Sequence, residues 1–425
     1  MVGKCRLQGV ALACVVSSVA TSVFARLAFV LPETLYAVPG VECNVYYFDV
    51  LDSVNPSAYA FEAEAEAGVG QSLSECWRWT PRESDAGARR SVVFRAWSDD
   101  GLVAAATTTV RVARAPRQTE RRLTVAQIAA SSANCLYQDQ IFRRMREAGF
   151  SNYTPVGSHS GGGEWCKECC RVKPGFVPHD GYGGFTFGDF LRRWRLSPDE
   201  ESELQNEAER EQLRSVGVTF VPDKQTWQAW RRHLLKSPLL QMRGGRPVID
   251  VQSWLNRINE GRAPDILIVD LGGNGVFNQT PETIEAHVRD VQLKDAAELL
   301  RVMRAACPDT LFAMATRCVG ACDQSAYGKN YGGRFSQQQA HKNFMFWNRA
   351  LMEFVRTFND PHLTLVPVSQ SVDPLRGYPS TTEPASAQLT AKVVRGTNAI
   401  HPTIEGGRQI GDAYYAWLRC WLEDH

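Results

Sequence analysis

The chain has 425 residues, a length that accommodates two or three domains with sizeable cores. Its 47 basic and 46 acidic side chains leave a formal net charge of +1, so no overall field draws it to nucleic acid or to an anionic membrane. We therefore expect no nucleic-acid partner, and other partners must be inferred from individual sites.

The first 25 residues have the pattern of a secretory signal peptide. Lys4 and Arg6 precede an apolar run over 10–24, and Val23-Phe24-Ala25 fits the small-x-small cleavage pattern. A buried N-terminal helix is the alternative. We expect a secreted protein, extracellular, periplasmic or on the cell surface, whose mature chain has no membrane span.

Residues 30–114 have the pattern of an all-β module. Short stretches rich in β-branched and aromatic residues predict strands at 41–51, 58–64, 76–80, 91–97 and 102–112. Gly101 supplies the positive φ of a hairpin turn between the last two. The spacing favours a small antiparallel sandwich that resembles immunoglobulin-like modules.

Two pairs of residues in this module favour structural roles. Cys43 and Cys76 could join two of its strands by a disulfide, as an exported protein allows. Trp77 and Trp79 alternate on one face, which favours a place in the core over a surface on which sugars stack.

The polar segment 115–122 is predicted to be a linker, and residues 123–425 then alternate between strand and helix patterns. Apolar runs predict strands at 123–128, 266–271, 311–315 and 363–368. Helical periodicity covers 136–148, 200–215, 226–235, 283–306, 337–358 and 405–422. This alternation predicts an α/β domain with a mainly parallel sheet that is covered on both faces.

Several loops of this domain carry residues suited to chemistry. Ser131 and Ser132 follow the first strand, where the carboxyl end of an open α/β sheet forms the usual ligand crevice. Capping of the next helix is the structural alternative for these serines. The glycine-rich segment 179–186, the Gly272-Gly273-Asn274-Gly275 turn and His401 in the segment 398–403 complete the set.

In this order the loops resemble the sequence blocks of the SGNH or GDSL hydrolase family, over roughly 123–422. The motifs that carry the resemblance are Ala129-Ala130-Ser131-Ser132, Gly184 ahead of Phe185-Thr186, Gly272-Gly273-Asn274-Gly275 and Asn398-Ala399-Ile400-His401. The segments 327–335 (YGKNYGGRF) and 409–418 (QIGDAYYAWL) are similar to a bacterial subgroup with a β module ahead of the hydrolase. The resemblance implies a three-layer, flavodoxin-like SGNH hydrolase domain behind the β-sandwich.

The same resemblance implies a serine esterase that needs no metal and no cofactor. Ser131 would be the nucleophile and His401 the general base. The backbone amides of Ser131 and Gly184 and the side-chain amide of Asn274 would form the oxyanion hole. Short acyl esters, including acetylated carbohydrates, are the substrates that the family implies.

Departures from the family pattern leave two functions open. Asn398 stands where the family has the aspartate that orients the histidine, Ala129-Ala130 replace Gly-Asp, and Gly275 replaces another aspartate. One hypothesis is an esterase with a Ser131–His401 dyad, in which a backbone carbonyl or an acid such as Asp180 orients the histidine. The other is a catalytically weakened hydrolase fold that binds a glycan or another surface ligand.

A cysteine cluster lies in an insertion just ahead of the glycine-rich segment. Cys166, Cys169 and Cys170 have a spacing that suits zinc, with Cys318 and either Cys322 or His159 to complete a site. Disulfides are favoured over zinc in an exported chain, and they would fix a loop at the rim of the cleft. Neither the pairing of the cysteines in disulfides nor the oligomeric state follows from the sequence.

Overall fold

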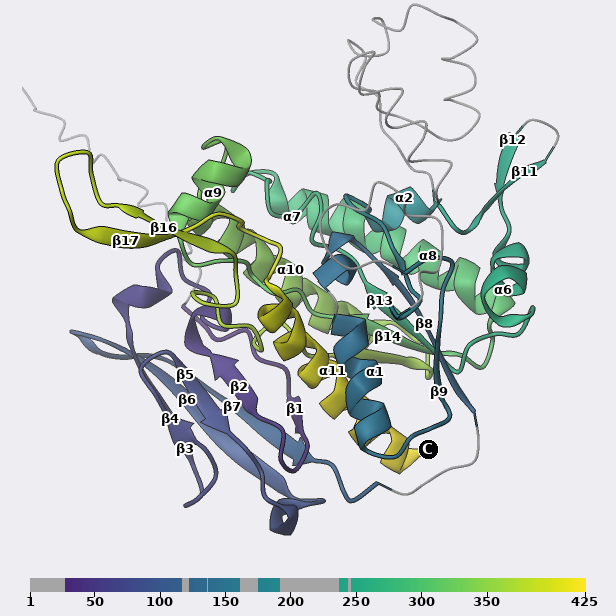
Figure 1. The fold of residues 1–425 in the computed structure, drawn as a ribbon, viewed down its shortest axis with the longest axis horizontal. Helices are drawn as coiled ribbons and strands as arrows, with labels where there is room; N and C mark the ends of the chain where they lie inside the picture. Colours follow the sequence, from purple (N-terminus) through teal and green to yellow (C-terminus); the bar gives the residue numbers. More distant parts are fainter. Residues whose placement is uncertain (1–26, 117–121, 136, 161–174, 192–236, 244–245) are drawn as a thin grey trace, which may run out of the picture.

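The chain folds into an N-terminal β module and a larger mixed α/β domain (Figure 1). The computed structural model describes residues 27–116, 122–135, 137–160, 175–191, 237–243 and 246–425. The predicted signal segment 1–25, the helices predicted at 200–215 and 226–235, and Cys166, Cys169 and Cys170 all lie outside these residues. The predicted mixed α/β architecture with a parallel sheet is confirmed.

The N-terminal module contains two small sheets. Its strands are β1 (Thr34–Ala37), β2 (Cys43–Tyr46), β3 (Ala60–Ala65), β4 (Gln71–Ser72), β5 (Cys76–Trp79), β6 (Arg89–Ser98) and β7 (Gly101–Val112). One sheet has the order β1-β7-β6-β3 and the other the order β2-β5-β4. Side chains from both sheets, among them Val45, Trp77 and Phe94, form one hydrophobic cluster. The immunoglobulin-like arrangement of these strands stays a prediction.

Local details of the module confirm some expectations and correct others. Gly101 has a φ of 116° at the β6–β7 hairpin, as the turn requires. Trp77 and Trp79 are both buried in the core. The strand predicted over 41–51 is shorter, because the chain leaves β2 for a 3₁₀ turn at Tyr47–Asp49.

The predicted Cys43–Cys76 disulfide is wrong. In the antiparallel β2–β5 pair Cys43 lies opposite Trp79, and Cys76 lies opposite Tyr46. The two cysteines therefore stand three residue steps apart along the ladder, about 10 Å at the usual rise of a strand. Both thiols are free, and Cys43 Sγ instead donates to the Tyr36 carbonyl.

A parallel sheet forms the centre of the α/β domain. Its strands are β8 (Leu123–Ala129), β9 (Tyr153–Val156), β10 (Asp180–Gly181), β13 (Ile266–Asp270), β14 (Leu311–Ala315) and β15 (Leu363–Val366). β9 and β10 both pair with one side of β8, and β13, β14 and β15 follow on the other side. This is the flavodoxin-like 2-1-3-4-5 order, whose switch point between β8 and β13 is where such sheets bind ligands.

Helices cover both faces of the sheet (Figure 1). They are α1 (Tyr137–Glu147), α2 (Phe187–Leu191), α6 (Val251–Asn259), α7 (Ile284–His287), α8 (Leu293–Ala306), α9 (Gln324–Tyr331), α10 (Gln337–Thr357) and α11 (Ile404–Asp424). α1 and α11 pack on one face with Ile266 and Ile268, whereas α6, α8 and α10 pack on the other with Leu267 and Val269. The central strands β8, β13 and β14 are therefore mainly apolar, because both of their faces are buried.

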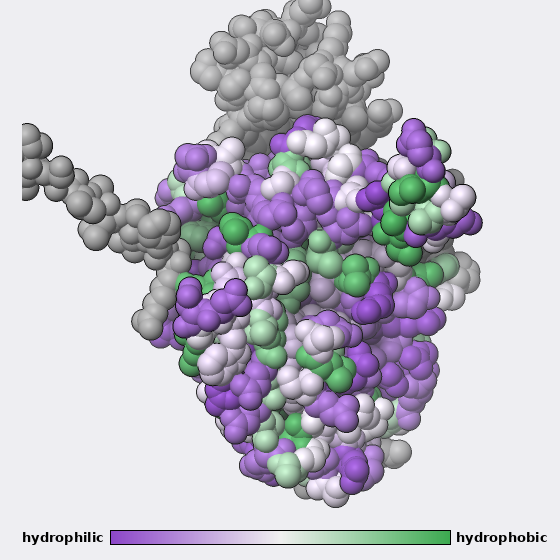
Figure 2. All heavy atoms as spheres, turned by 90° about the vertical axis from the view of Figure 1, so that its left-hand side faces the viewer, coloured by the Kyte–Doolittle hydropathy of each residue, from purple (hydrophilic) through white to green (hydrophobic). Residues whose placement is uncertain are grey.

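Two features depart from the simple helix–strand alternation. The helix predicted over 283–306 contains a π turn at Val288–Gln292, between α7 and α8. Two hairpins also extend from the domain, β11 (Leu240–Arg243) with β12 (Arg246–Ile249) and β16 (Ser380–Pro384) with β17 (Lys392–Gly396). In Figure 2 the face beside the second hairpin is mostly hydrophilic, with separate hydrophobic spots. Within the described residues, no helix is long and apolar enough to cross a membrane.

The β module is docked firmly onto the α/β domain. The buried Asp52 carboxylate accepts from both Lys342 and Arg349 of α10. His341 Nε2 lies 2.8 Å from the Phe48 carbonyl, and Arg111 of β7 pairs with Asp424 of α11. Charged contacts therefore join the module to both long helices of the domain.

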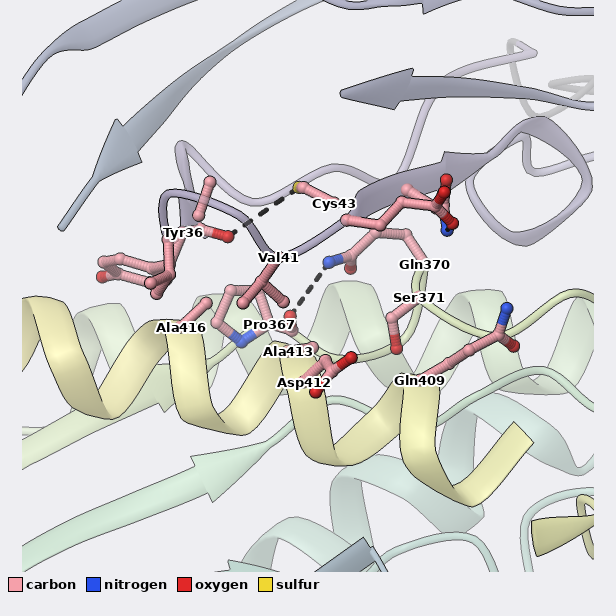
Figure 3. A pocket seen from close by; sticks show the side chains of 14 residues that line it. Tyr36, Val41, Cys43, Pro367, Gln370, Ser371, Gln409, Asp412, Ala413 and Ala416 are labelled. Carbon is pink, nitrogen blue, oxygen red and sulfur yellow. Dashed lines mark hydrogen bonds between the residues drawn. The ribbon is translucent and has the colours of Figure 1, made fainter. Parts of the chain in front are cut away.

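A small pocket marks the seam between module and domain (Figure 3). Residues of the β1–β2 segment face α11 and the segment after β15 across it, and the labelled Gln370 amide donates to the Pro367 carbonyl at 2.9 Å. Its accessible volume of about 70 Å³ is lined by Val41, Cys43 and Asp412 among others. A second, larger hollow of about 440 Å³ lies along the same seam, between residues 29–36 of the module and α10 with β15.

We predict that module and domain unfold in one cooperative transition. Asp52→Ala should lower the free energy of unfolding by about 1–3 kcal/mol, because Lys342 and Arg349 lose a buried acceptor. Calorimetry of the wild type and of this variant measures both effects. Glu64→Ala, which removes an exposed ion pair with Arg95, is the control and should change stability by less than about 0.5 kcal/mol. Two separate transitions in the wild type would contradict the rigid seam.

Candidate active site

The carboxyl ends of four neighbouring strands bring the candidate residues to one edge of the sheet. Ser131 follows β8, the Gly183-Gly184 turn follows β10, Asn274 follows β13 and Arg317 follows β14. Because β8 and β13 border the switch point, Ser131 and Asn274 flank the crevice where this topology places ligands. His401 reaches the same place from the loop before α11.

Ser131 and His401 form a hydrogen-bonded pair. Ser131 Oγ lies 2.8 Å from His401 Nε2, and Ser131 is 9% exposed. The adjacent Ser132 turns the other way and donates to Asp270 Oδ2 at 3.1 Å. The structure therefore separates the two serines, since Ser131 contacts the histidine whereas Ser132 is held between the buried Asp270 and Arg317.

The loop that carries His401 is held by backbone contacts on two sides. Ala399 O accepts from Ala321 N at 2.8 Å, and Ala399 N donates to Asn330 Oδ1 at 2.6 Å. Asn330 belongs to α9, in the YGKNYGGRF segment, so this segment supports the histidine loop. Thr403 then caps α11 by accepting from Gly406 N at 3.1 Å.

Asn398 contacts the backbone of the histidine loop. Its Oδ1 accepts from the backbone amides of Ile400 at 3.2 Å and His401 at 3.0 Å. These two bonds make a local turn, which is a structural use of an asparagine at this position. Asn398 thus fixes the position of the His401 backbone.

The expectation that Asp180 orients His401 is wrong. Asp180 Oδ1 accepts from Ser158 Oγ and from Tyr182 OH at 3.1 Å, while Oδ2 accepts from Trp254 Nε1 at 3.0 Å. Both oxygens of this fully buried carboxylate are therefore engaged beneath the glycine-rich turn. Burial explains the arrangement, because a buried carboxylate requires several donors.

The glycine-rich turn lies against both the serine loop and the asparagine loop. A Cβ placed on Gly183 would lie 3.9 Å from Ser131 Cβ, and Gly184 has a φ of 83° that favours glycine. Asn274 Nδ2 donates to the Phe185 carbonyl at 3.0 Å. The structure thus gathers Ser131, Gly184 and Asn274 in the region where an oxyanion hole is expected.

Buried polar groups anchor this turn from below. Tyr182 N donates to Ala129 O at 2.9 Å, and His159 Nε2 lies 2.8 Å from the Gly181 carbonyl. Asp189 Oδ2 accepts from Thr186 N and Oγ1, and burial raises the pKa of Asp189 to about 7. The turn is therefore held by contacts that do not depend on a ligand.

Two charged residues of the site were missed by the sequence analysis. Asp270 is 3% exposed and accepts from Ser132, from Tyr137 OH and from Arg317 Nη1. Arg317 Nη1 also donates to Ser132 Oγ at 3.1 Å. The available signal was a charged residue at or just past the end of a buried strand. Asp270 is the last residue of ILIVD, and Arg317 comes two residues after β14.

The electrostatic environment keeps His401 neutral. Burial, and secondly the positive charge of Arg317, lower the pKa of His401 from 6.5 to about 4. The imidazole is therefore unprotonated at neutral pH and can accept a proton. The same environment makes the imidazolium that follows proton transfer costly.

The residues proposed for zinc do not come together in the described part of the chain. Cys318 Sγ donates to the Val368 carbonyl at 3.6 Å, and His159 is buried against Gly181. Among described residues, no group of three or more candidate ligands is close enough to hold a metal ion. Cys166, Cys169 and Cys170 lie outside those residues, so both zinc and a disulfide there stay predictions.

No protein-family model matches the sequence, and neither does any curated protein. Similar solved structures are carbohydrate esterases. A family 3 enzyme from Talaromyces cellulolyticus has 12% identity, a TM-score of 0.37 and coverage of 71% of this chain and 99% of that chain. A family two enzyme from Clostridium thermocellum in complex with cellohexaose has 11% identity, a TM-score of 0.32 and coverage of 91% and 94%. These likenesses are too distant to indicate the activity of this chain.

We predict that Gly272→Ala disrupts the asparagine loop. Gly272 has a φ of +94°, and a Cβ there would lie 2.1 Å from Trp347 Cζ2. The strain and the clash should each cost about 1–3 kcal/mol of stability and displace Asn274. Thermal unfolding and labelling of Ser131 by a fluorophosphonate measure the two effects. Gly328→Ala in α9 is the control, because no heavy atom lies within 4 Å of its Cβ position. Equal behaviour of the two variants would contradict the role of Gly272.

Proposed function

We propose that the protein is a secreted serine esterase that cleaves short acyl esters, including acetyl groups on carbohydrates. The 2.8 Å contact between Ser131 Oγ and His401 Nε2, at the switch point of the sheet, carries this proposal. Asn274 and the Gly183-Gly184 turn beside it support an acyl-transfer site. Secretion is supported by the pattern of residues 1–25, and the substrate class by the resemblance of the sequence blocks.

The geometry supports a two-step mechanism through an acyl-enzyme. His401 Nε2 accepts the proton of Ser131 as Oγ bonds to the ester carbonyl carbon, and negative charge develops on the carbonyl oxygen. The backbone amides of Ser131 and Gly184 and the Asn274 amide would stabilise that charge. The carbon–alkoxide bond then breaks, and His401 returns the proton to the leaving alcohol. Water activated by His401 hydrolyses the acyl group from Ser131 in the second step.

A second candidate function is ligand binding by a catalytically weakened site. Asn398 contacts the backbone of His401, and both burial and Arg317 disfavour the imidazolium. A histidine with a pKa of about 4 is a weak base, so proton transfer from Ser131 is less favourable than at an ordinary histidine. These observations favour a slow enzyme or a binding protein, and activity measurements separate the two.

We predict that the wild type hydrolyses 4-nitrophenyl acetate and that Ser131→Ala loses at least about 10³-fold in kcat/KM, as for a removed nucleophile. Ser132→Ala is the neighbouring comparison and should lose about ten-fold or less, because Ser132 only supports the loop. A fluorophosphonate should label Ser131 alone. Equal rates of hydrolysis in the wild type and Ser131→Ala would exclude the esterase and favour the binding function.

The low pKa of His401 predicts an unusual pH profile. A base must be unprotonated to act, so kcat/KM should fall only as the pH drops through about 4, well below the ordinary value of 6.5. Asn398→Asp adds a negative charge beside the histidine and should move this acidic limb to higher pH. It should also raise kcat about ten-fold or more, because a carboxylate stabilises the imidazolium. An acidic limb at 6.5 in the wild type would contradict the assigned environment.

A further inference from the structure

Arg317 is fixed beside the dyad by its backbone and by one nitrogen of its guanidinium. Its backbone N donates to Asn348 Oδ1 at 2.8 Å, and its carbonyl accepts from Asn348 Nδ2 at 2.8 Å. Nη1 donates to both Asp270 and Ser132 Oγ. The guanidinium therefore stands behind the serine loop in one orientation.

One edge of this guanidinium is left without a partner. Among the described residues, Arg317 Nε is buried and has no hydrogen-bond acceptor. Gly273 stands directly against this edge, because a Cβ there would lie 3.2 Å from Nε and 3.4 Å from Nη2, so a larger residue at 273 would crowd both donors. The Nε–Nη2 edge presents two parallel donors, the arrangement that binds a carboxylate through two hydrogen bonds.

Among the described residues, the carboxylate that pairs with Arg317 is the buried Asp270. Asp270 is 3% exposed, and both Asp270 oxygens accept hydrogen bonds beneath the serine loop. The neighbouring positions Ala130, Gly275 and Asn398 are uncharged. Arg317 keeps 14% of its side chain exposed. Asp270 offsets part of the charge of Arg317, and the part of the guanidinium that stays exposed beside these uncharged positions attracts an anion.

We propose that the ester cleaved at Ser131 carries a carboxylate close to its scissile bond, and that Arg317 is the residue that binds this carboxylate. The inference rests on the proposed esterase function and narrows its substrate class. The carboxylate belongs either to the acyl part, as in a hemisuccinate, or to the alcohol, as in an acetylated uronic acid. Arg317 is thus a specificity-determining residue, and Gly273 provides the space beside it.

Binding of such a carboxylate also helps the chemical step. An anion on Arg317 offsets the positive charge that acts on His401, so proton transfer from Ser131 becomes easier. The substrate then supplies negative charge that Asn398 does not provide. The preference for charged esters should therefore appear in kcat as well as in KM, whereas a merely attractive surface charge would change KM alone.

Two matched pairs of esters test the inference. The acyl pair is 4-nitrophenyl hemisuccinate and 4-nitrophenyl butyrate, and the alcohol pair is an acetylated methyl glucuronoside and an acetylated methyl glucoside. The wild type should prefer the charged member of one pair by at least about ten-fold in kcat/KM. The pair that shows the preference identifies which part of the ester carries the carboxylate.

Two variants remove the interaction in different ways. Arg317→Gln removes the charge, and Gly273→Ala leaves the charge and the Asp270 pair but covers the Nε–Nη2 edge with a methyl group. Both should bring the charged-to-neutral ratio to within about three-fold of one. Arg317→Lys should keep part of the ratio. Because each ratio compares two esters on the same variant, a general loss of activity does not affect it. If Arg317→Gln does not fold, Gly273→Ala alone tests the interaction.

Binding of products to Ser131→Ala tests the same contact without catalysis. Methyl glucuronoside should bind more tightly than methyl glucoside if the alcohol carries the carboxylate, and succinate, which has a second carboxylate, should bind more tightly than butyrate if the acyl part carries it. Gly273→Ala in the same background should remove the difference. Hydrolysis of neutral esters with charged-to-neutral ratios near one in both pairs would overturn the carboxylate inference and leave the esterase intact. If no ester is cleaved, the esterase fails, and product binding alone decides whether Arg317 holds a carboxylate.

Discussion

The buried carboxylate of Asp270 is the constraint on which the candidate site depends. A carboxylate at 3% exposure must be compensated, and here the donors come from Ser132, Tyr137 and Arg317. These donors belong to the serine loop, to α1 and to the end of β14. One desolvated charge at the end of β13 thus fixes the separation of three segments. The orientation of Ser131 follows, because its neighbour Ser132 is held by Asp270.

Hydrophobic patterning was enough to predict most of the parallel strands and long helices from the sequence. The order of the polar loops was also enough to select Ser131, Asn274 and His401. The Asp270–Arg317 pair could not be predicted, because it arises only when β13 and β14 lie in parallel register. The register of β2 and β5, which places Cys43 and Cys76 three residues apart, likewise excludes a disulfide between them. Side chains far apart in sequence need the strand pairing before their contacts can be inferred.

The geometry and the electrostatics of the dyad favour different conclusions. The 2.8 Å contact places Ser131 for proton transfer, but burial and Arg317 oppose the charge that the transfer creates on His401. Asn398 Oδ1 holds the loop in position by accepting from the backbone amides of Ile400 and His401, and it adds no charge. An aspartate at this position could both position His401 and stabilise its positive charge. Asn398 provides only the positioning. The activity of the site then depends on where a compensating negative charge comes from.

The β module contributes to this positioning. Val30 and Phe48 of the module belong to one hydrophobic cluster with Val319, Phe277 and Ile400. Phe277 lies three residues after Asn274, Val319 lies two residues after Arg317, and Ile400 precedes His401. Because a packed cluster transmits strain, the module restrains the three loops that carry Asn274, Arg317 and His401. The docked module therefore forms part of the framework of the candidate site, and its charged contacts with α10 and α11 hold it there.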